Sequence, residues 1–110
     1  MTRRLCRLDE IADPGGKGVT LEEAGGARRE IVVIRRGEDV FGYVNACPHI
    51  GTALETFPDQ FLTRDRREIL CTTHGARFRI ADGYCVVGPC QGLSLTTIAI
   101  RLRDGEVELV

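Results

Sequence analysis

Two short stretches of nearly the same composition constrain this chain more than any other feature of its sequence. Residues 47–51 read CPHIG and residues 71–75 read CTTHG, so each of the two histidines follows a cysteine and precedes a glycine. Thiolate and imidazole are donors that bind transition metals. We therefore expect the fold to bring both stretches together, so that one metal site is formed by Cys47, His49, Cys71 and His74.

The bulk composition bounds the fold and the partners. The chain has 110 residues, of which 43% are hydrophobic and 28% charged, with a formal net charge of −1. A chain of this length forms one domain with one modest core. A charge so close to zero favours neither nucleic acid nor an acidic membrane as a partner.

The N-terminal residues and the cysteine count bear on the compartment. No apolar run approaches the roughly 20 residues of a membrane helix. The start, MTRRLCRLDEIAD, lacks the apolar stretch of a secretory signal. We therefore expect a cytoplasmic protein. In a reducing compartment, five cysteines favour metal binding or catalysis over a disulfide framework.

The pattern of apolar residues predicts an all-β chain with a hairpin on each side of the two stretches. Residues 29–36 and 40–46 are rich in β-branched and aromatic residues and are separated by the turn sequence RGED. Residues 95–102 alternate apolar and other side chains, and EVELV at 106–110 returns after an Arg-Asp-Gly turn. Helical periodicity is weak, with a single turn expected in TLEEAGG, residues 20–26.

Residues 47–92, between the hairpins, differ in character from the rest. They hold both histidines and most of the cysteines and prolines, and they predict loops with short strands near 68–70 and 76–80. The sequence FPDQFLTRDRRE at 57–68 is expected to be a surface excursion between the two stretches. A β scaffold that carries a loop-built site is the simplest description.

Two kinds of metal site compete for these four ligands. Tetrahedral zinc usually takes cysteines together and histidines together, in knuckles of like type. Here each stretch mixes one cysteine with one histidine. This mixture suits a Rieske 2Fe–2S centre, in which two histidines hold one iron and two cysteines hold the other.

Several stretches resemble the Rieske iron–sulfur family. CPHIG and CTTHGARF are similar to its two ligand loops, ADGYCVVGP to its Gly-Pro loop, and LSLTTIAIRLRDGEVEL to its closing strands. The resemblance implies one Rieske domain over residues 1–110, an antiparallel β basal domain with a loop-rich cluster-binding subdomain at about 47–92. It also implies one 2Fe–2S cluster per chain. In that assignment His49 and His74 hold the outer iron, and Cys47 and Cys71 the inner one.

The resemblance also bears on the reduction potential. In high-potential members a disulfide joins the two loops, and serine and tyrosine hydroxyls bond the cluster sulfurs. The matching residues here are Thr52 and Thr73 for the cysteines, Ala76 for the serine and Phe78 for the tyrosine. Because fewer donors stabilise the added electron, we predict a potential near the low end of the Rieske range, roughly −150 mV.

Three cysteines lie outside the ligand motif. Cys85 and Cys90 flank VVGP, and they are compatible with inert buried thiols, a disulfide that staples this loop, or a thiol redox pair. We favour inert burial, because cysteine packs as a small apolar residue and the compartment is reducing. Cys6 lies in the strand pattern RLCRL and is expected in the core.

The resemblance implies a one-electron carrier rather than an enzyme. An oxygenase needs a mononuclear iron held by two histidines and a carboxylate, yet the cluster uses both histidines, and no Gly-rich nucleotide motif is present. We expect a Rieske-type ferredoxin whose partners are a reductase and a terminal enzyme, such as a ring-hydroxylating dioxygenase or nitrite reductase. The alternatives are a redox- or iron-sensing regulatory domain and a zinc-stabilised interaction module.

Overall fold

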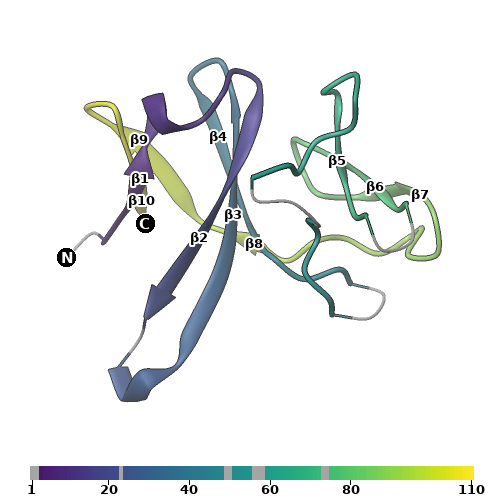
Figure 1. Cartoon of the computed structure of the whole chain (residues 1–110), viewed down its shortest axis with the longest axis horizontal. Coiled ribbons are helices and arrows are strands. Elements are labelled where there is room, and N and C mark those ends of the chain that lie inside the picture. Colours follow the sequence, from purple (N-terminus) through teal and green to yellow (C-terminus); the bar gives the residue numbers. More distant parts are fainter. Residues whose placement is uncertain (1–2, 23, 49–50, 56–58, 73–74) are drawn as a thin grey trace.

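The computed structural model describes residues 3–22, 24–48, 51–55, 59–72 and 75–110 (Figure 1). The elements in chain order are β1 (Arg3–Arg7), η1 (Leu8–Glu10), β2 (Gly15–Glu22), η2 (Ala24–Gly26), β3 (Arg28–Arg36), β4 (Asp39–Val44), β5 (Glu68–Leu70), β6 (Arg77–Arg79), β7 (Cys85–Val87), β8 (Thr97–Ile98), β9 (Ile100–Arg103) and β10 (Glu106–Leu109). The elements η1 and η2 are short 3-10 helices. The predicted all-β class is confirmed.

Three antiparallel sheets make up the molecule. Their strand orders are β1-β10-β9, β2-β3-β4-β8 and β5-β6-β7. The first two sheets form the left half of Figure 1, and the β5-β6-β7 sheet forms the right half. Among the described residues, no helix is long and apolar enough to cross a membrane.

Both predicted hairpins are confirmed, and the second one is more elaborate than expected. Strands β3 and β4 pair from Arg36↔Asp39, next to the turn, as far as Ile31↔Val44. The predicted strand 95–102 is divided at Ala99, because β8 pairs with β4 whereas β9 pairs with β10. The predicted alternation of side chains along residues 95–102 is confirmed, since Ile98 is buried and Ala99 is exposed. This segment therefore connects two sheets.

The helical turn predicted at 20–26 is largely wrong. Residues 20–22 end β2, and Leu21 is buried opposite Arg29 of β3. The short element η2 follows, but Gly25 within it has φ 86°, outside the helical region. Cross-strand pairing and burial thus override a weak local preference. Strand β2 itself was missed, because glycines are poor strand formers.

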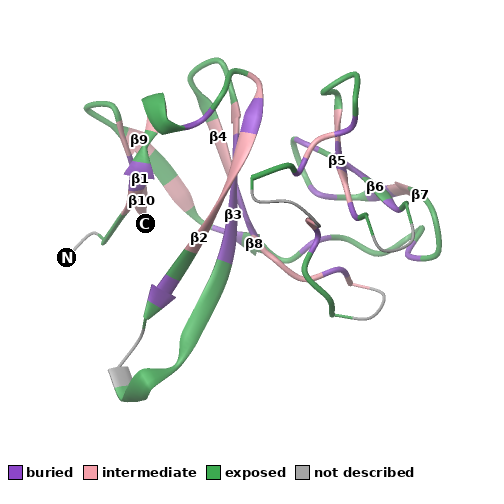
Figure 2. Ribbon diagram, viewed as in Figure 1, coloured by how far each residue is buried: buried purple, intermediate pink, exposed green. Residues whose placement is uncertain are grey.

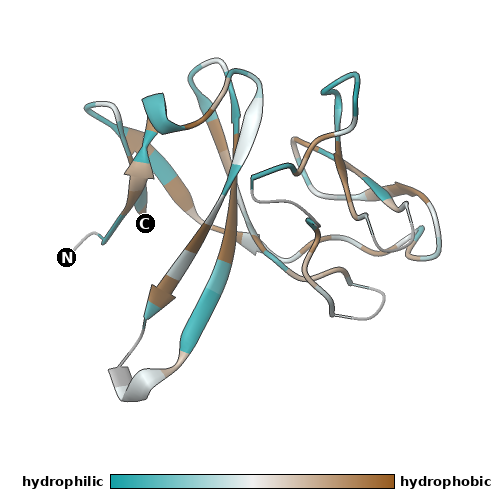
Figure 3. Cartoon of the chain, viewed as in Figure 1, coloured by the Kyte–Doolittle hydropathy of each residue, from teal (hydrophilic) through white to brown (hydrophobic). Residues whose placement is uncertain are grey.

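The middle of strand β3 is buried (Figure 2), and its two faces belong to two apolar cores. Val32 and Ile34 pack with the residues around β5, β6 and β7, while Ile31 and Val33 pack between the other two sheets. All four side chains are fully buried. Figure 3 shows the apolar middle of the strand between hydrophilic ends. A continuous apolar run is what a strand covered on both faces requires.

Tyr43 of β4 links the two halves through one buried hydrogen bond. Its ring is 1% exposed, and its hydroxyl donates to the carbonyl of Ile80, which follows β6. Removing the hydroxyl in Tyr43→Phe leaves that carbonyl without its partner. We expect the free energy of unfolding to fall by about 1–3 kcal/mol, measured by urea denaturation.

Tyr84→Phe is the matched control, because Tyr84 is 37% exposed and its ring contact with Arg79 does not need the hydroxyl. Equal losses in both variants would contradict the role of Tyr43. Burial also raises the pKa of Tyr43 from 10 to about 12. The folded protein keeps a proton that the unfolded chain loses, so this share of stability should disappear as pH rises from 10 towards 12.

Candidate metal centre

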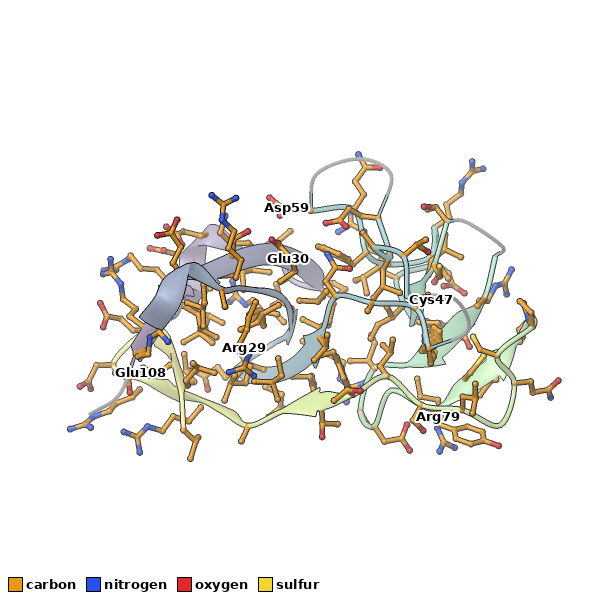
Figure 4. All side chains as sticks on the ribbon, turned by 90° about the horizontal axis from the view of Figure 1, so that it is seen from below. Arg29, Glu30, Cys47, Asp59, Arg79 and Glu108 are labelled. Carbon is orange, nitrogen blue, oxygen red and sulfur yellow. The ribbon has the colours of Figure 1, made fainter. Side chains whose placement is uncertain are left out.

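Each of the two predicted cysteine ligands lies just beyond the end of a β-strand and is buried. Cys47 comes shortly after β4 and is 1% exposed, and Cys71 comes directly after β5 and is 0% exposed. Both belong to the core cluster shared with β3. Figure 4 shows Cys47 in the interior of this half, whereas Arg79 lies at its surface. The two predicted histidine ligands, His49 and His74, lie outside the described residues.

The two loops are closed by the same pair of backbone hydrogen bonds. In the first, Cys47 N–H donates to Thr52 O at 2.7 Å, and Gly51 N–H donates to Cys47 O at 2.7 Å. In the second, the equivalent bonds are Cys71 N–H to Ala76 O and Gly75 N–H to Cys71 O, both 2.9 Å.

The glycines of these loops occupy the same conformation. Gly51 has φ 77° and Gly75 has φ 71°, both in the left-handed region that glycine adopts without strain. The repeat in the sequence is thus a repeat in the backbone, and each cysteine sits at the same point of its loop.

The two loops are also joined to each other. The carbonyl of Leu54, a buried residue near the end of the first loop, accepts hydrogen bonds from Thr72 N–H at 3.0 Å and Thr72 Oγ1 at 3.1 Å. The Asn45 side chain accepts from Leu54 N–H at 2.8 Å and donates to Glu55 Oε1 at 2.9 Å. The two Thr72 bonds join the loops, and the Asn45 bonds hold the segment of Leu54 and Glu55 in place. In the sequence, the only signal for Asn45 is its place just before the first loop.

The Gly-Pro loop covers the second cysteine loop. A Cβ atom on Gly88 would lie 2.8 Å from the Cα atom of Ala76, so the two backbones are in direct contact. Ala76 and Phe78 are both fully buried. These are the two positions that carry a serine and a tyrosine in high-potential members of the family. In this chain both lie inside the core and neither side chain has a hydroxyl.

Cys85 and Cys90 are buried, free thiols rather than a disulfide. Their sulfur atoms are 3.3 Å apart, and the Cys85 thiol donates to Val87 O at 3.3 Å. Burial, assisted by hydrogen bonds with the sulfurs of Cys85 and Cys47, raises the pKa of Cys90 to about 12. Cys47, Cys85 and Cys90 belong to the same buried core cluster, a grouping that the sequence did not indicate.

The predictions for Cys6 and for residues 57–68 have different outcomes. Cys6 is 4% exposed in the second core, as predicted, and burial raises its pKa to about 11. The excursion at 57–68 is only partly a surface feature. Residues 64–67 are exposed, but Phe61 is 1% exposed and its ring lies where a side chain on Gly16 would stand. Residues 57 and 58 lie outside the described residues.

The chemistry of this donor set fits an iron–sulfur cluster. Two cysteines occupy equivalent, buried positions on paired loops, and the sequence places one imidazole in each of the same loops. Two sulfur and two nitrogen donors arranged as equivalent pairs match a Rieske centre. Within the described ranges, which include neither histidine, no group of three or more metal-binding side chains comes together.

Known proteins share both the family signature and the fold. The family model described as Rieske [2Fe-2S] domain matches residues 3–99. The Sphingomonas yanoikuyae B1 ferredoxin is 27% identical, with a TM-score of 0.72 over 99% of this chain and 97% of that one. The ferredoxin of carbazole 1,9a-dioxygenase from Nocardioides aromaticivorans IC177 is 22% identical, with a TM-score of 0.75 over 100% and 97%.

A third similar structure contains two components of one system. It is a complex of reduced oxygenase and oxidized ferredoxin in carbazole 1,9a-dioxygenase, 20% identical, with a TM-score of 0.74 over 99% of this chain and 92% of that one. No sequence among the curated proteins matches this chain.

Proposed function

The chain belongs to the Rieske 2Fe–2S family, and we propose that it acts as a one-electron carrier, a Rieske-type ferredoxin. Its cofactor is a 2Fe–2S cluster. The observation that carries the proposal is the pair of equivalent loops, each with a buried cysteine at the same point. The chain matches almost the whole length of two ferredoxins, and it is not a catalyst on its own.

We assign the four ligands by combining the loops with the sequence. Cys47 and Cys71 would hold the inner iron, since both are buried, and His49 and His74 would hold the outer iron. When bound, the cluster supplies one-electron redox chemistry. The chain's part is to hold the cysteine sulfurs in an apolar core and to keep the loops in register through Leu54.

The domain organisation follows the same division. We propose a single domain over residues 1–110 with a cluster-binding subdomain at about 47–92. In support, the sheet β5-β6-β7 lies wholly within that range and the other two sheets lie outside it. Strand β3 belongs to the basal part but supplies Val32 and Ile34 to the core beside the ligand loops.

Two observations bear on the partners, namely the number of histidines in the chain and a similar ferredoxin in complex with an oxygenase. Both histidines of the chain are in the ligand loops, so none remains for a mononuclear catalytic iron. One similar ferredoxin is found in complex with its oxygenase. We propose a reductase as electron donor and a terminal enzyme, a ring-hydroxylating dioxygenase or a nitrite reductase, as acceptor.

The net charge of −1 supports neither nucleic acid nor membrane as partner, and we propose a cytoplasmic location.

Reversible one-electron reduction is the test of this function. The purified protein should be red-brown, give a Rieske-type EPR spectrum after dithionite reduction, and return to its oxidised absorbance when an acceptor is added. A colourless protein that binds one zinc ion would establish the interaction module instead. Cluster loss in air that changes binding to a partner protein would establish the sensing domain.

The reduction potential is a separate prediction. We expect a midpoint near the low end of the Rieske range, roughly −150 mV, in a spectroscopic redox titration. Phe78→Tyr should raise it by about 20–60 mV, because a neutral hydrogen bond contributes about 0.5–1.5 kcal/mol and 59 mV corresponds to a factor of ten.

Phe41→Tyr is the control for this substitution. It adds the same hydroxyl on β4, at a position that is only half-buried, and should leave the potential unchanged. A positive potential in the unmodified protein would contradict the prediction.

A further inference from the structure

We propose that Asn45 is a positioning residue for the metal centre. Its side-chain amide fixes both ligand loops to the basal sheet, and so sets how long the loops retain the cluster and how uniform the cluster geometry is. This inference rests on the proposed function, since it takes these loops as the holders of the cluster. Asn45 itself makes no bond to the cluster and acts through Leu54 and Thr72.

The backbone of Asn45 belongs to the basal scaffold. Its N–H donates to the carbonyl of Glu30 in β3 at 2.9 Å, which continues the pairing of β3 with β4 one residue beyond Ile31↔Val44. Strand β3 is the longest in the described parts of the chain, and its middle is buried. The place of Asn45 is therefore set by the scaffold, two residues before Cys47.

The side-chain amide of Asn45 holds the end of the first loop with both of its polar atoms. Its Oδ1 accepts from Leu54 N–H at 2.8 Å, and its Nδ2 donates to Glu55 Oε1 at 2.9 Å. The two neighbours require one acceptor and one donor, which a single amide supplies. The carboxylate of Glu55 also lies against β2, since Oε2 is 3.4 Å from the place of a Cβ on Gly18.

Leu54 transmits this position to the second loop. Its N–H is held by Asn45, and its carbonyl accepts from Thr72 N–H at 3.0 Å and from Thr72 Oγ1 at 3.1 Å. Thr72 directly follows Cys71 in the sequence. A shift of Leu54 therefore moves the point at which the two loops are joined.

The burial of Leu54 makes the Asn45 bond costly to lose. The residue is 0% exposed, and a buried donor without a partner costs more than the net contribution of one hydrogen bond. Local opening of a folded protein is governed by such contacts. In the proposed ligand set each loop supplies one cysteine and one histidine, so the cluster is released when the loops come apart.

Asn45→Ala tests the inference through the rate of cluster loss and the EPR line shape. With an iron chelator present, the cluster should be lost about 5- to 100-fold faster, which corresponds to about 1–3 kcal/mol. The EPR lines of the reduced, loaded variant should be broader, because the loops then take a range of separations. A residue that contributes only stability would leave that line shape unchanged.

Thr72→Val and Thr72→Ser test the far end of the chain of bonds. The valine variant removes the hydroxyl at nearly constant shape and should lose the cluster about two- to tenfold faster, whereas the serine variant keeps the hydroxyl and should match the unmodified protein. Thr20→Val is the matched control. It removes a hydroxyl that donates to Glu30 Oε2 at 2.8 Å between β2 and β3, and should leave cluster loss unchanged.

A reversed hydrogen bond tests the Asn45 amide itself. Asn45→Asp alone keeps the acceptor for Leu54 N–H but places a second carboxylate against Glu55, so cluster loss should accelerate. Combining it with Glu55→Gln supplies an amide donor to the new carboxylate, with no change in net charge. This double variant should recover the slow cluster loss and the narrow EPR lines of the unmodified protein.

The combined variant Asn45→Ala with Thr72→Val measures the coupling between the two ends. If Asn45 acts through Leu54, the combined acceleration should be smaller than the product of the two single effects, because the first loss already loosens the joint.

Four outcomes would overturn the inference. These are cluster loss at the unmodified rate in Asn45→Ala, an equal acceleration in Thr20→Val, no recovery in the reversed pair, and fully independent effects of Asn45→Ala and Thr72→Val. In each case a normal Rieske spectrum of the unmodified protein would leave the proposed function standing. Absence of that spectrum would instead refute the proposed function.

Discussion

Cys71→Ala is expected to yield a colourless protein with no Rieske EPR signal. Iron content should fall from about two atoms per chain to nearly none, because the inner iron loses one of its two thiolates. Stability should fall with it, since cluster binding contributes directly to the free energy of folding. Iron analysis, the absorption spectrum and thermal unfolding measure these effects.

Cys6→Ala is the matched control, because Cys6 is also a buried cysteine but belongs to the other core. It removes the same atom at a comparable depth and should cost only packing energy, with colour and EPR signal retained. A Cys71→Ala protein that keeps two irons and the Rieske spectrum would remove Cys71 from the ligand set.

Gly88→Ala is expected to loosen the contact between the Gly-Pro loop and the second cysteine loop. Gly88 has φ 105°, and an added Cβ would lie 2.8 Å from the Cα and 3.1 Å from the Cβ of Ala76. Backbone strain costs about 1–3 kcal/mol, and forced overpacking costs about 1–3 kcal/mol more. We expect a total loss of about 2–6 kcal/mol in urea denaturation, with faster cluster loss in the presence of chelator.

Gly92→Ala separates the cost of backbone strain from the cost of overpacking. Gly92 has φ 94°, but no atom lies within 4 Å of the added Cβ, so only backbone strain applies. The control should lose about 1–3 kcal/mol and keep its cluster as long as the unmodified protein does. If Gly88→Ala lost no more than Gly92→Ala, the contact with Ala76 would carry no weight.

The candidate site was readable because its signal is local. The ligand residue types stand at short spacings within CPHIG and CTTHG, and the glycine that each loop requires follows its histidine in the sequence. Backbone hydrogen bonds of the same pattern then follow in both loops. The hairpin of β3 and β4 was readable for the same reason, since β-branched residues and a turn signal are adjacent along the chain.

Two features of the fold run against the local sequence signal and were not readable. Strand β2 contains glycines that argue against a strand, and it forms because eight residues pair with β3. Phe61 appeared to lie on the surface among charged residues, yet it is buried against the glycines of β2. Phe61 is remote in sequence from the glycines that it covers, whereas β2 adjoins β3 along the chain and was missed because its own residues are poor strand formers.

The sequence by itself thus determined the residue types of the candidate ligands, their grouping into two similar loops and the all-β class, because each is encoded by neighbouring residues. Only the tertiary structure decided that β3 divides its apolar run between two cores, with Ile31 and Val33 on one side and Val32 and Ile34 on the other. It also decided that Cys85 and Cys90 share the buried core of the ligand loops, with their sulfur atoms 3.3 Å apart. Contacts of this kind depend on how separate segments pack, and no local pattern in the chain specifies them.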